Sequence, residues 1–216
     1  MKIAVLFRGP LRPNIQSVLE KVNYFMMHFN GSDAEVHTYL ATWRYYNSQK
    51  ASDLIGLDMF DNVIMQTPPT DEQAQARTGM SYMKNGTAIG NVYRMYYQSK
   101  TALDLINSHD YYDYIIHTRT DLYMALDQPE LWFNPTYYAA PHVHPEPWMC
   151  DQFGIANADM MHRAWDYGTQ DNLNRMLQNA SIPENVLQTM MDEAGITAKA
   201  APYRLWQLDD NRNSNI

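Results

Sequence analysis

Strand-length apolar runs alternate with helix-period segments along the first third of the chain. Residues 2–7 form an apolar run that predicts a first, central strand. From Ile15 to about residue 30, apolar side chains recur every three or four positions, which predicts an amphipathic helix. Residues 35–43 and 62–66 predict a second and a third strand, with a short helix at 52–57 between them. This β-α-β-α-β order indicates a Rossmann-like half with a parallel sheet.

The middle of the chain leads into the most informative stretch. Residues 67–91 contain two adjacent prolines and three glycines among many small polar residues, which predicts a long loop. Residues 92–108 predict a helix, and Ile115 with Ile116 predicts a strand that is buried on both faces. After this pair the chain turns polar, because residues 117–121 are His-Thr-Arg-Thr-Asp. At the end of a buried strand in an open α/β sheet, such residues indicate a ligand site.

The rest of the chain predicts further strands and helices that complete one domain. Short strands are expected at 122–124, 137–140, 151–156 and 203–208, helices at 158–168, 169–180 and 183–194, and a polar tail from residue 209. The predicted fold is therefore a single α/β domain over residues 1–216. It has a mixed twisted sheet, a Rossmann-like N-terminal half and helices on both faces.

Composition narrows the class of partner. The net charge is −8 and no Lys/Arg cluster is present, which disfavours nucleic acid. An anionic ligand would need locally placed arginines or a bound cation. Sixteen tyrosines and five tryptophans exceed what a small core needs, so some are expected at a surface for flat or sugar-like ligands. The single Cys150 favours a reducing, cytoplasmic compartment, and residues 2–7 are too short for a signal peptide or membrane span.

Asp121 and Arg119 carry the chemistry of the central stretch. The carboxylate of Asp121 suits a divalent cation, and the guanidinium of Arg119 suits a phosphate. In the alternative interpretation, Asp121 caps the next turn and Arg119 pairs with a surface carboxylate. Spacing alone leaves both interpretations open.

The ends of the first two predicted strands supply further candidates. Arg8 and Arg12 flank a Gly-Pro pair in a predicted turn, and Gly9 would let the backbone approach a ligand closely. We expect Arg8 to face the ligand and one of the two arginines to be a surface cation. Thr42 and Trp43 end the second strand at the same crevice, where core packing of Trp43 is the alternative.

Several later residues have a functional and a structural interpretation. Arg94 and Lys100 are on the predicted helix before the central strand. Each of them either reaches an anionic ligand or is solvated. Asp151 is either a catalytic carboxylate or a polar residue that begins a strand. His142 and His144 alternate in a proline-rich loop, and contact with an acceptor is as good an interpretation of them as metal binding.

In combination, four landmarks resemble a GT-A-fold glycosyltransferase that uses a nucleotide sugar. They are a first strand ending in Arg8-Gly-Pro-Leu-Arg12, a second ending in Thr42-Trp43, the Arg119-Thr-Asp121-Leu signature, and Asp151-Gln-Phe153 followed by a helix. The chain is also similar to glycosyltransferase domains encoded by large algal (chlorella) viruses. The resemblance implies a nucleotide-binding half at about 1–124 and an acceptor half at about 125–216, and host cytoplasm as the location of a viral protein.

The resemblance also implies roles for residues. Asp121 matches the second carboxylate of the Asp-x-Asp motif that holds Mn²⁺ or Mg²⁺ against the donor diphosphate, while Arg119 stands in place of the first. Asp151 would act as the base for the acceptor hydroxyl, or as a nucleophile or stabiliser of the sugar. Arg8, Gly9, Arg12, Thr42, Trp43, Arg94 and Arg119 would contact the donor.

The implied activity is metal-dependent transfer of a hexose or deoxyhexose to a glycan hydroxyl. UDP-sugar is the expected donor, because GT-A families of this kind mostly use it. The rival hypothesis is a non-catalytic glycan- or nucleotide-binding module, which the missing first aspartate favours. A nucleotidyltransferase would carry a longer, Gly-rich basic loop after its first strand than this chain has.

Overall fold

The structure is a computed structural model that describes residues 1–11, 15–29, 33–44, 56–109, 111–124, 137–139, 151–200 and 205–207. Its strands are β1 (Lys2–Arg8), β2 (Glu35–Trp43), β3 (Asn62–Gln66), β4 (Tyr114–Arg119), β5 (Leu122–Met124), β6 (Tyr137–Ala139), β7 (Phe153–Asn157), β8 (Ala198–Ala200) and β9 (Leu205–Gln207). Its α-helices are α1 (Ile15–Phe29), α2 (Asp71–Thr78), α3 (Ile89–His109), α4 (Ala158–Ala164), α5 (Gln170–Asn179) and α6 (Pro183–Glu193), and Leu57–Met59 forms a short 3-10 helix.

Seven strands form one mixed sheet in the order β3-β2-β1-β4-β7-β6-β8. The first four in this order are parallel, and β7 is antiparallel to both β4 and β6. The parallel part matches the predicted Rossmann-like half, with β1 in the interior of the sheet. Strands β5 and β9 pair with each other in a separate two-stranded sheet.

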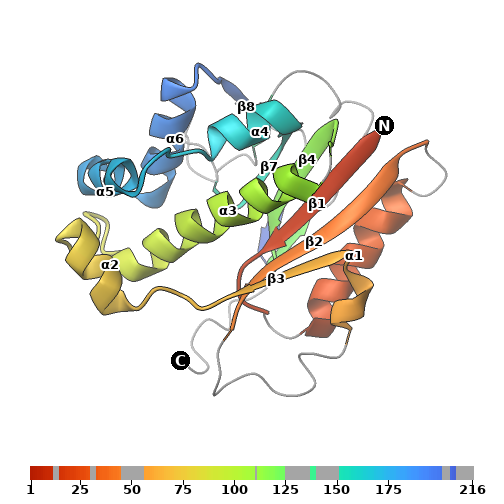
Figure 1. Ribbon diagram of the computed structural model, residues 1–216, viewed down its shortest axis with the longest axis horizontal. Helices are drawn as coiled ribbons and strands as arrows, with labels where there is room; N and C mark the ends of the chain where they lie inside the picture. The colour runs from red at the N-terminus through yellow and green to blue at the C-terminus, as the bar shows by residue number, and fades with distance from the viewer. Residues whose placement is uncertain are drawn as a thin grey trace.

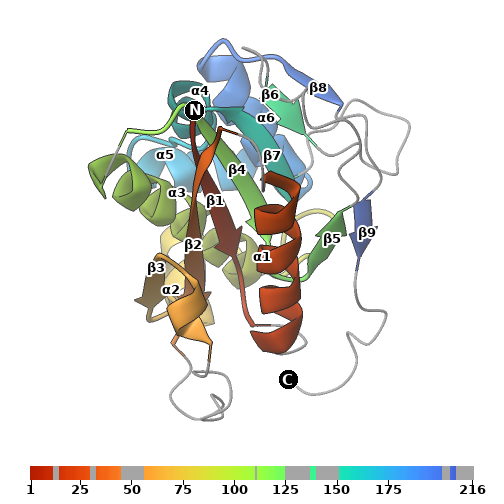
Figure 2. The same cartoon turned by 90° about the vertical axis from the view of Figure 1, so that its right-hand side faces the viewer.

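Helices cover both faces of the sheet, as predicted, because the central strands are apolar on both sides. On one face, Val5 and Phe7 of β1 pack in a cluster with Val18 and Val22 of α1. On the other face, Leu6 belongs to a larger cluster with side chains from α3, α4, α5 and α6. Figures 1 and 2 show α1 and α3 on opposite sides of the sheet. Alternate residues of β1 therefore point toward different helical layers.

The long loop predicted at 67–91 is wrong. Residues 71–78 form α2, and α3 begins at Ile89, three residues before the predicted start at 92. The side chain of Thr70 accepts a hydrogen bond from the backbone N–H of Gln73, whose own side chain accepts one from the N–H of Thr70. This reciprocal capping box starts the helix despite the two prolines that precede it.

The structure places the polar residues at the end of the central strand, as the sequence indicated. His117, Thr118 and Arg119 are the last three residues of β4. His117 and Thr118 are buried, so the strand carries polar side chains into the core. Strand β4 pairs with β1 as far as its last residue, Arg119, which lies opposite Arg8.

Other boundaries shift by a few residues. Helix α4 ends at Ala164 instead of residue 168, and β7 begins at Phe153, so that Asp151 lies in a turn before the strand. The sequence did not predict β8. The predicted helix at 52–57 falls mostly outside the described residues. In the part of the chain that the structure describes, no helix combines the length and apolar character needed to cross a membrane.

We expect Thr70→Ala to lower the free energy of unfolding by about 1 kcal/mol, because the α2 N–H that the Thr70 side chain caps would lose its partner. Urea denaturation at neutral pH measures this change. Thr70→Ser keeps the capping oxygen and should remain close to the wild type. Equal stability of the alanine variant and the wild type would contradict the assigned start of α2.

Candidate functional site

Parallel pairing brings the ends of three strands to one edge of the sheet. Arg8 of β1 lies in register with Ala41 of β2 and with Arg119 of β4. Residues in register on neighbouring strands point to the same face, so Arg8 and Arg119 share the α3 side with Trp43, two residues beyond Ala41. Thr120 ties the ends of β1 and β4 together, because its N–H donates to the carbonyl of Arg8 at 2.9 Å.

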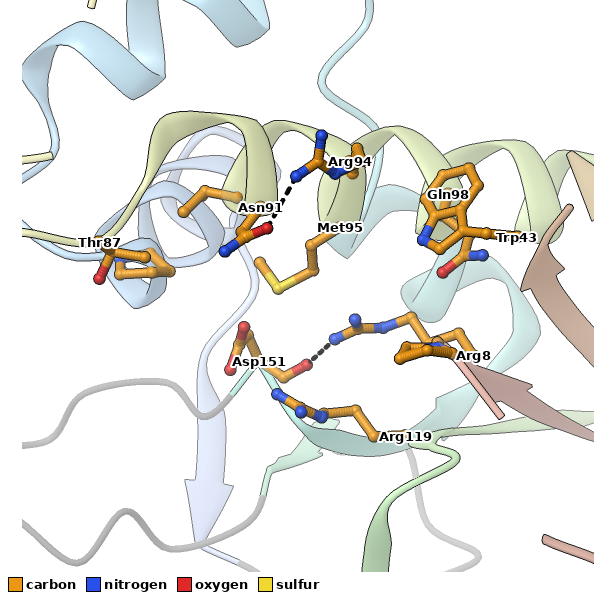
Figure 3. Close-up of a pocket in the computed structure, with 13 residues that line it drawn as sticks. Arg8, Trp43, Thr87, Asn91, Arg94, Met95, Gln98, Arg119 and Asp151 are labelled. Atoms are coloured by element: carbon orange, nitrogen blue, oxygen red, sulfur yellow. Dashed lines mark hydrogen bonds between the residues drawn. The ribbon is translucent and has the colours of Figure 1, made fainter. Parts of the chain in front are cut away.

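A cavity of about 360 Å³ opens at this edge, between the sheet and α3. Figure 3 shows the guanidinium groups of Arg8 and Arg119 both pointing toward Asp151. The lining residues come from the ends of β1, β2 and β4, from α3 and the segment before it, from the turn before β7 and from the first residue of α6: Arg8, Gly9, Pro10, Trp43, Thr87, Asn91, Val92, Arg94, Met95, Gln98, Arg119, Asp151 and Pro183. Each of the four sequence landmarks therefore contributes to this one pocket, through Arg8, Trp43, Arg119 and Asp151.

The sequence had suggested that Arg8 lies in a turn. In the structure it is instead a buried residue of β1. It is the last residue of β1 and only 3% exposed. Its Nε donates to Nε2 of His117 at 2.9 Å, and its Nη2 donates to the backbone carbonyl of Asp151. The guanidinium carbon lies 5.4 Å from the ring centre of Trp165. Burial lowers the pKa of Arg8 to about 10, against the charge of Asp151, so the side chain stays charged at neutral pH.

His117 supports Arg8 from inside the sheet. Its side chain is fully buried, and its ring centre lies 4.4 Å from that of Trp165. Burial, together with the charge of Arg8, lowers the pKa of His117 well below its usual value. Because Nε2 accepts from Arg8, the neutral ring carries its proton on Nδ1, which has no hydrogen-bond partner among the described residues. His117 is therefore a neutral acceptor that orients Arg8.

Arg119 and Asp121 form a two-point ion pair. Nε of Arg119 donates to Oδ1 of Asp121 at 2.7 Å, and Nη2 donates to Oδ2 at 2.6 Å. Burial alone would raise the pKa of Asp121, but the hydrogen bonds and charge of Arg119, with the charge of Lys21, bring it below its usual value. The alternative interpretation paired Arg119 with a surface carboxylate. In the structure its partner is Asp121, two residues away, whose side chain is only 15% exposed.

Lys21 adds a second cation beside Asp121. It projects from α1, is 3% exposed, and donates from Nζ to the backbone carbonyl of Thr120. Burial lowers its pKa to about 8, and the negative charge of Asp121 opposes that shift. At neutral pH Asp121 therefore lies between two positive charges. Lys21 was not among the predicted site residues, because it lies on a helix of otherwise ordinary amphipathic pattern.

The described residues around Asp121 do not fit a divalent cation. Both carboxylate oxygens already accept hydrogen bonds from Arg119, whose charge would repel a metal ion. The described part of the chain holds no group of three His, Cys, Asp or Glu side chains that suits a metal. His142, His144 and Cys150 lie outside the described residues, as does Arg12.

Asp151 combines a fixed backbone with a side chain at the pocket. Its carbonyl is held by Arg8, its side chain lines the cavity, and the residue is 5% exposed. The sequence had treated it either as a catalytic carboxylate or as the first residue of a strand. It occupies a turn in front of β7, on the side of the pocket toward which Arg8 and Arg119 point (Figure 3).

Thr42 and Arg94 are less suited to a ligand than predicted. Thr42 is buried but does not line the cavity, because alternation along β2 turns it away from Trp43. Arg94 does line it, yet its Nη1 pairs with Asp71 at 2.8 Å and its Nη2 donates to Asn91 at 2.8 Å. The guanidinium points away from Asp151 in Figure 3, so Arg94 joins α2 to α3.

Gln98 and Gly9 complete the pocket. Gln98 of α3 is 2% exposed, and within the described residues its Nε2 has no hydrogen-bond partner. A buried amide without a protein partner at a cavity is available to donate to a ligand or a water molecule. No local sequence pattern marks Gln98, since a glutamine in a helix is normally solvated. Gly9 has a φ of +124°, and a Cβ there would lie 3.1 Å from Oγ1 of Thr120, which explains why the β1 end is built with glycine.

Comparison with solved structures identifies the fold. The galactosyltransferase LgtC, in complex with donor and acceptor sugar analogues, superposes with a TM-score of 0.50 at 10% identity, over 92% of this chain and 73% of that chain. A variant of Drosophila β-1,4-galactosyltransferase 7, in complex with manganese, UDP-Gal and xylobiose, gives a TM-score of 0.44 at 10% identity, over 93% of this chain and 65% of that chain. No family model and no curated protein matches the sequence. The chain has the GT-A glycosyltransferase fold, and similarity to algal-virus domains stays a prediction.

We expect His117 to make the fold sensitive to acid. Its folded-state pKa lies below the unfolded value of about 6.5, so the unfolded chain binds more protons as the pH falls through 6.5. Stability should then fall by up to about 1.4 kcal/mol per pH unit from this residue. His117→Gln keeps an acceptor for Arg8 but does not titrate, and its unfolding free energy should fall less between pH 7 and pH 5. Equal losses in the variant and the wild type would contradict the neutral, buried histidine.

Proposed function

We propose that this protein transfers a hexose or deoxyhexose from a nucleotide sugar, most simply a UDP-sugar, to the hydroxyl of a glycan. One observation carries the proposal. In a GT-A fold, the pocket at the carboxyl edge of the parallel strands brings together two arginines and a carboxylate, Arg8, Arg119 and Asp151. Ligands of open α/β sheets bind outside this edge. Both predicted halves, about 1–124 and about 125–216, contribute to the lining.

The two arginines suit the diphosphate of the donor. When the bond between the anomeric carbon and the diphosphate breaks, its electron pair stays on the leaving phosphate oxygen. Arg8 and Arg119 lie at the pocket as fixed cations that can stabilise this charge without reorganising. A preorganised donor of this kind contributes about 3 kcal/mol to the transition state. In a protein with a net charge of −8, these side chains also supply the local attraction that an anionic donor needs.

Trp43 and Gln98 suit the remaining parts of the donor. Trp43 lines the pocket from the end of β2, where an aromatic face can lie against the nucleoside or the sugar. Gln98 offers an amide that can hydrogen-bond to a base edge or a sugar hydroxyl. Uracil is the expected base through the resemblance to GT-A enzymes alone.

Asp151 is the residue we assign to the sugar. The anomeric carbon develops oxocarbenium character as the donor bond breaks, and a carboxylate facing it lowers the energy of that state. The acceptor oxygen forms the new bond to this carbon and gives up its proton, which Asp151 can take as a general base. As a nucleophile or stabiliser, the same carboxylate would instead act directly on the sugar.

A binding module without catalysis is the alternative. The observation that favours it is Arg119 at the position of the first aspartate in the Asp-x-Asp motif. Such a module would bind the nucleotide or glycan but would release no nucleoside diphosphate. Incubation with a panel of UDP-, GDP- and dTDP-sugars, followed by assay of the free diphosphate, separates the two functions.

We expect Asp151→Asn to reduce turnover by roughly a hundredfold or more while UDP binding stays within a few-fold, because the amide cannot act as a base or nucleophile. The backbone carbonyl that holds Arg8 is unchanged in this variant. Asp159→Asn is the matched control, since Asp159 is an exposed carboxylate on α4 paired with Arg163. UDP release and calorimetric UDP binding give the two readouts. Full turnover in Asp151→Asn would remove Asp151 from the mechanism, and no release by the wild type from any donor would favour the binding module.

A further inference from the structure

We infer that the guanidinium of Arg119, together with Arg8, takes the place of a divalent cation at the donor diphosphate, and that Asp121 is a positioning residue for Arg119 instead of a metal ligand. The inference rests on the proposed function, because it concerns how the same pocket holds a nucleotide sugar. It replaces the metal site that the resemblance to GT-A enzymes implied for Asp121.

The geometry of the ion pair is the first argument. Two charge-assisted hydrogen bonds, of 2.7 and 2.6 Å, occupy both oxygens of Asp121. Bidentate arginine–carboxylate pairs of this length are among the stronger polar contacts in proteins. The Asp121 side chain is 15% exposed, so a metal ion entering here would have to displace a partly buried guanidinium and remain beside it. Like charges at such distances repel strongly where water is largely excluded.

The distribution of charge is the second argument. Arg8, Lys21 and Arg119 lie around the ends of β1 and β4, and two carboxylates, Asp121 and Asp151, offset part of these three positive charges. A diphosphate therefore meets a positively charged strand edge without any added ion. Mg²⁺ and Mn²⁺ sites in proteins instead use one or two carboxylates whose oxygens face the ion. Asp121 has its oxygens turned to Arg119.

The orientation of Arg119 is the third argument. The ion pair uses Nε and Nη2, while the planar guanidinium also lines the cavity. Holding one edge of the group fixes the direction of the whole plane, which suits a guanidinium that binds phosphate oxygens. Asp121 thus pre-sets Arg119 before the donor arrives, as a supporting residue does for a catalytic cation. Arg8 is fixed in the same way by His117 and by the carbonyl of Asp151.

Binding of UDP to the full chain, measured by calorimetry in EDTA and in Mn²⁺, tests the inference first. The dissociation constant should agree within about twofold between the two conditions, because the arginines supply the charge. Binding that strengthens tenfold or more with Mn²⁺ would overturn this inference and leave the proposed function standing. Absence of UDP binding in both conditions would overturn both.

Two substitutions of Arg119 test the assignment of the charge to this residue. Arg119→Asp places a second carboxylate two residues before Asp121, so UDP binding in EDTA should weaken at least tenfold and become dependent on Mn²⁺. Arg119→Lys keeps the charge but cannot form the two-point pair, so binding should weaken several-fold and stay indifferent to EDTA. If either variant binds UDP in EDTA as the wild type does, the inference fails.

Asp121→Asn distinguishes positioning from metal ligation. An asparagine can still hold one N–H of Arg119, so UDP binding should weaken by the same modest factor in EDTA and in Mn²⁺. A metal ligand would lose only the Mn²⁺-dependent part, and that result would overturn the inference. Arg175→Ala, which removes an exposed arginine paired with Glu193, is the control and should leave UDP binding unchanged.

Discussion

A guanidinium buried at the end of a central strand cannot lose its charge at neutral pH, so its neighbours have to be arranged around it. Arg8 is 3% exposed, and its N–H groups donate to His117 and to the carbonyl of Asp151. An unpaired charge at this depth would destabilise the fold by several kcal/mol. The neutral state of His117 and the turn before β7 follow from this requirement. The same contacts direct Arg8 and Asp151 toward one cavity, and so couple the stability of the fold to its candidate function.

The parallel order of β3, β2, β1 and β4 turns this local arrangement into a site. Because the carboxyl ends of these parallel strands lie at the same end of the sheet, residues far apart in the chain line a single pocket between the sheet and α3 (Figure 3). Strand β7 then runs antiparallel beside β4 and brings Asp151 to the same place. The fold holds the carboxyl ends of these strands in place. The side chains at those ends determine whether a metal ion or arginines stabilise the diphosphate.

Local patterns were sufficient to predict much of this fold. The apolar runs that form β1 and β3 and the helical period of α1 are short-range signals, and the structure has these elements within one or two residues of their predicted ends. The prediction of a loop at residues 67–91 was wrong because it relied on the prolines and glycines and not on the helix-capping pattern that begins at Thr70. Between them, these patterns were enough to recognise a sheet with helices on both faces.

The site was harder to predict because its properties depend on distant partners. The burial of Arg8 depends on a carbonyl 143 positions away, which no local pattern reveals. Asp121 has the sequence context of a metal ligand, and the ion pair with Arg119, which argues against that role, became visible only in the structure. No sequence pattern identifies Gln98 as a site residue, because what distinguishes it is an amide without a hydrogen-bond partner among the described residues.

The central claim is that a nucleotide-sugar diphosphate binds between Arg8 and Arg119, with its sugar toward Asp151. A crystal structure of the complex with UDP or an unreactive UDP-sugar analogue, grown without divalent metal, tests it most directly. We expect phosphate oxygens within hydrogen-bond distance of both guanidinium groups. We also expect the ion pair between Arg119 and Asp121 to persist. A nucleotide bound away from the ends of β1 and β4 would show that these two arginines do not form the diphosphate site.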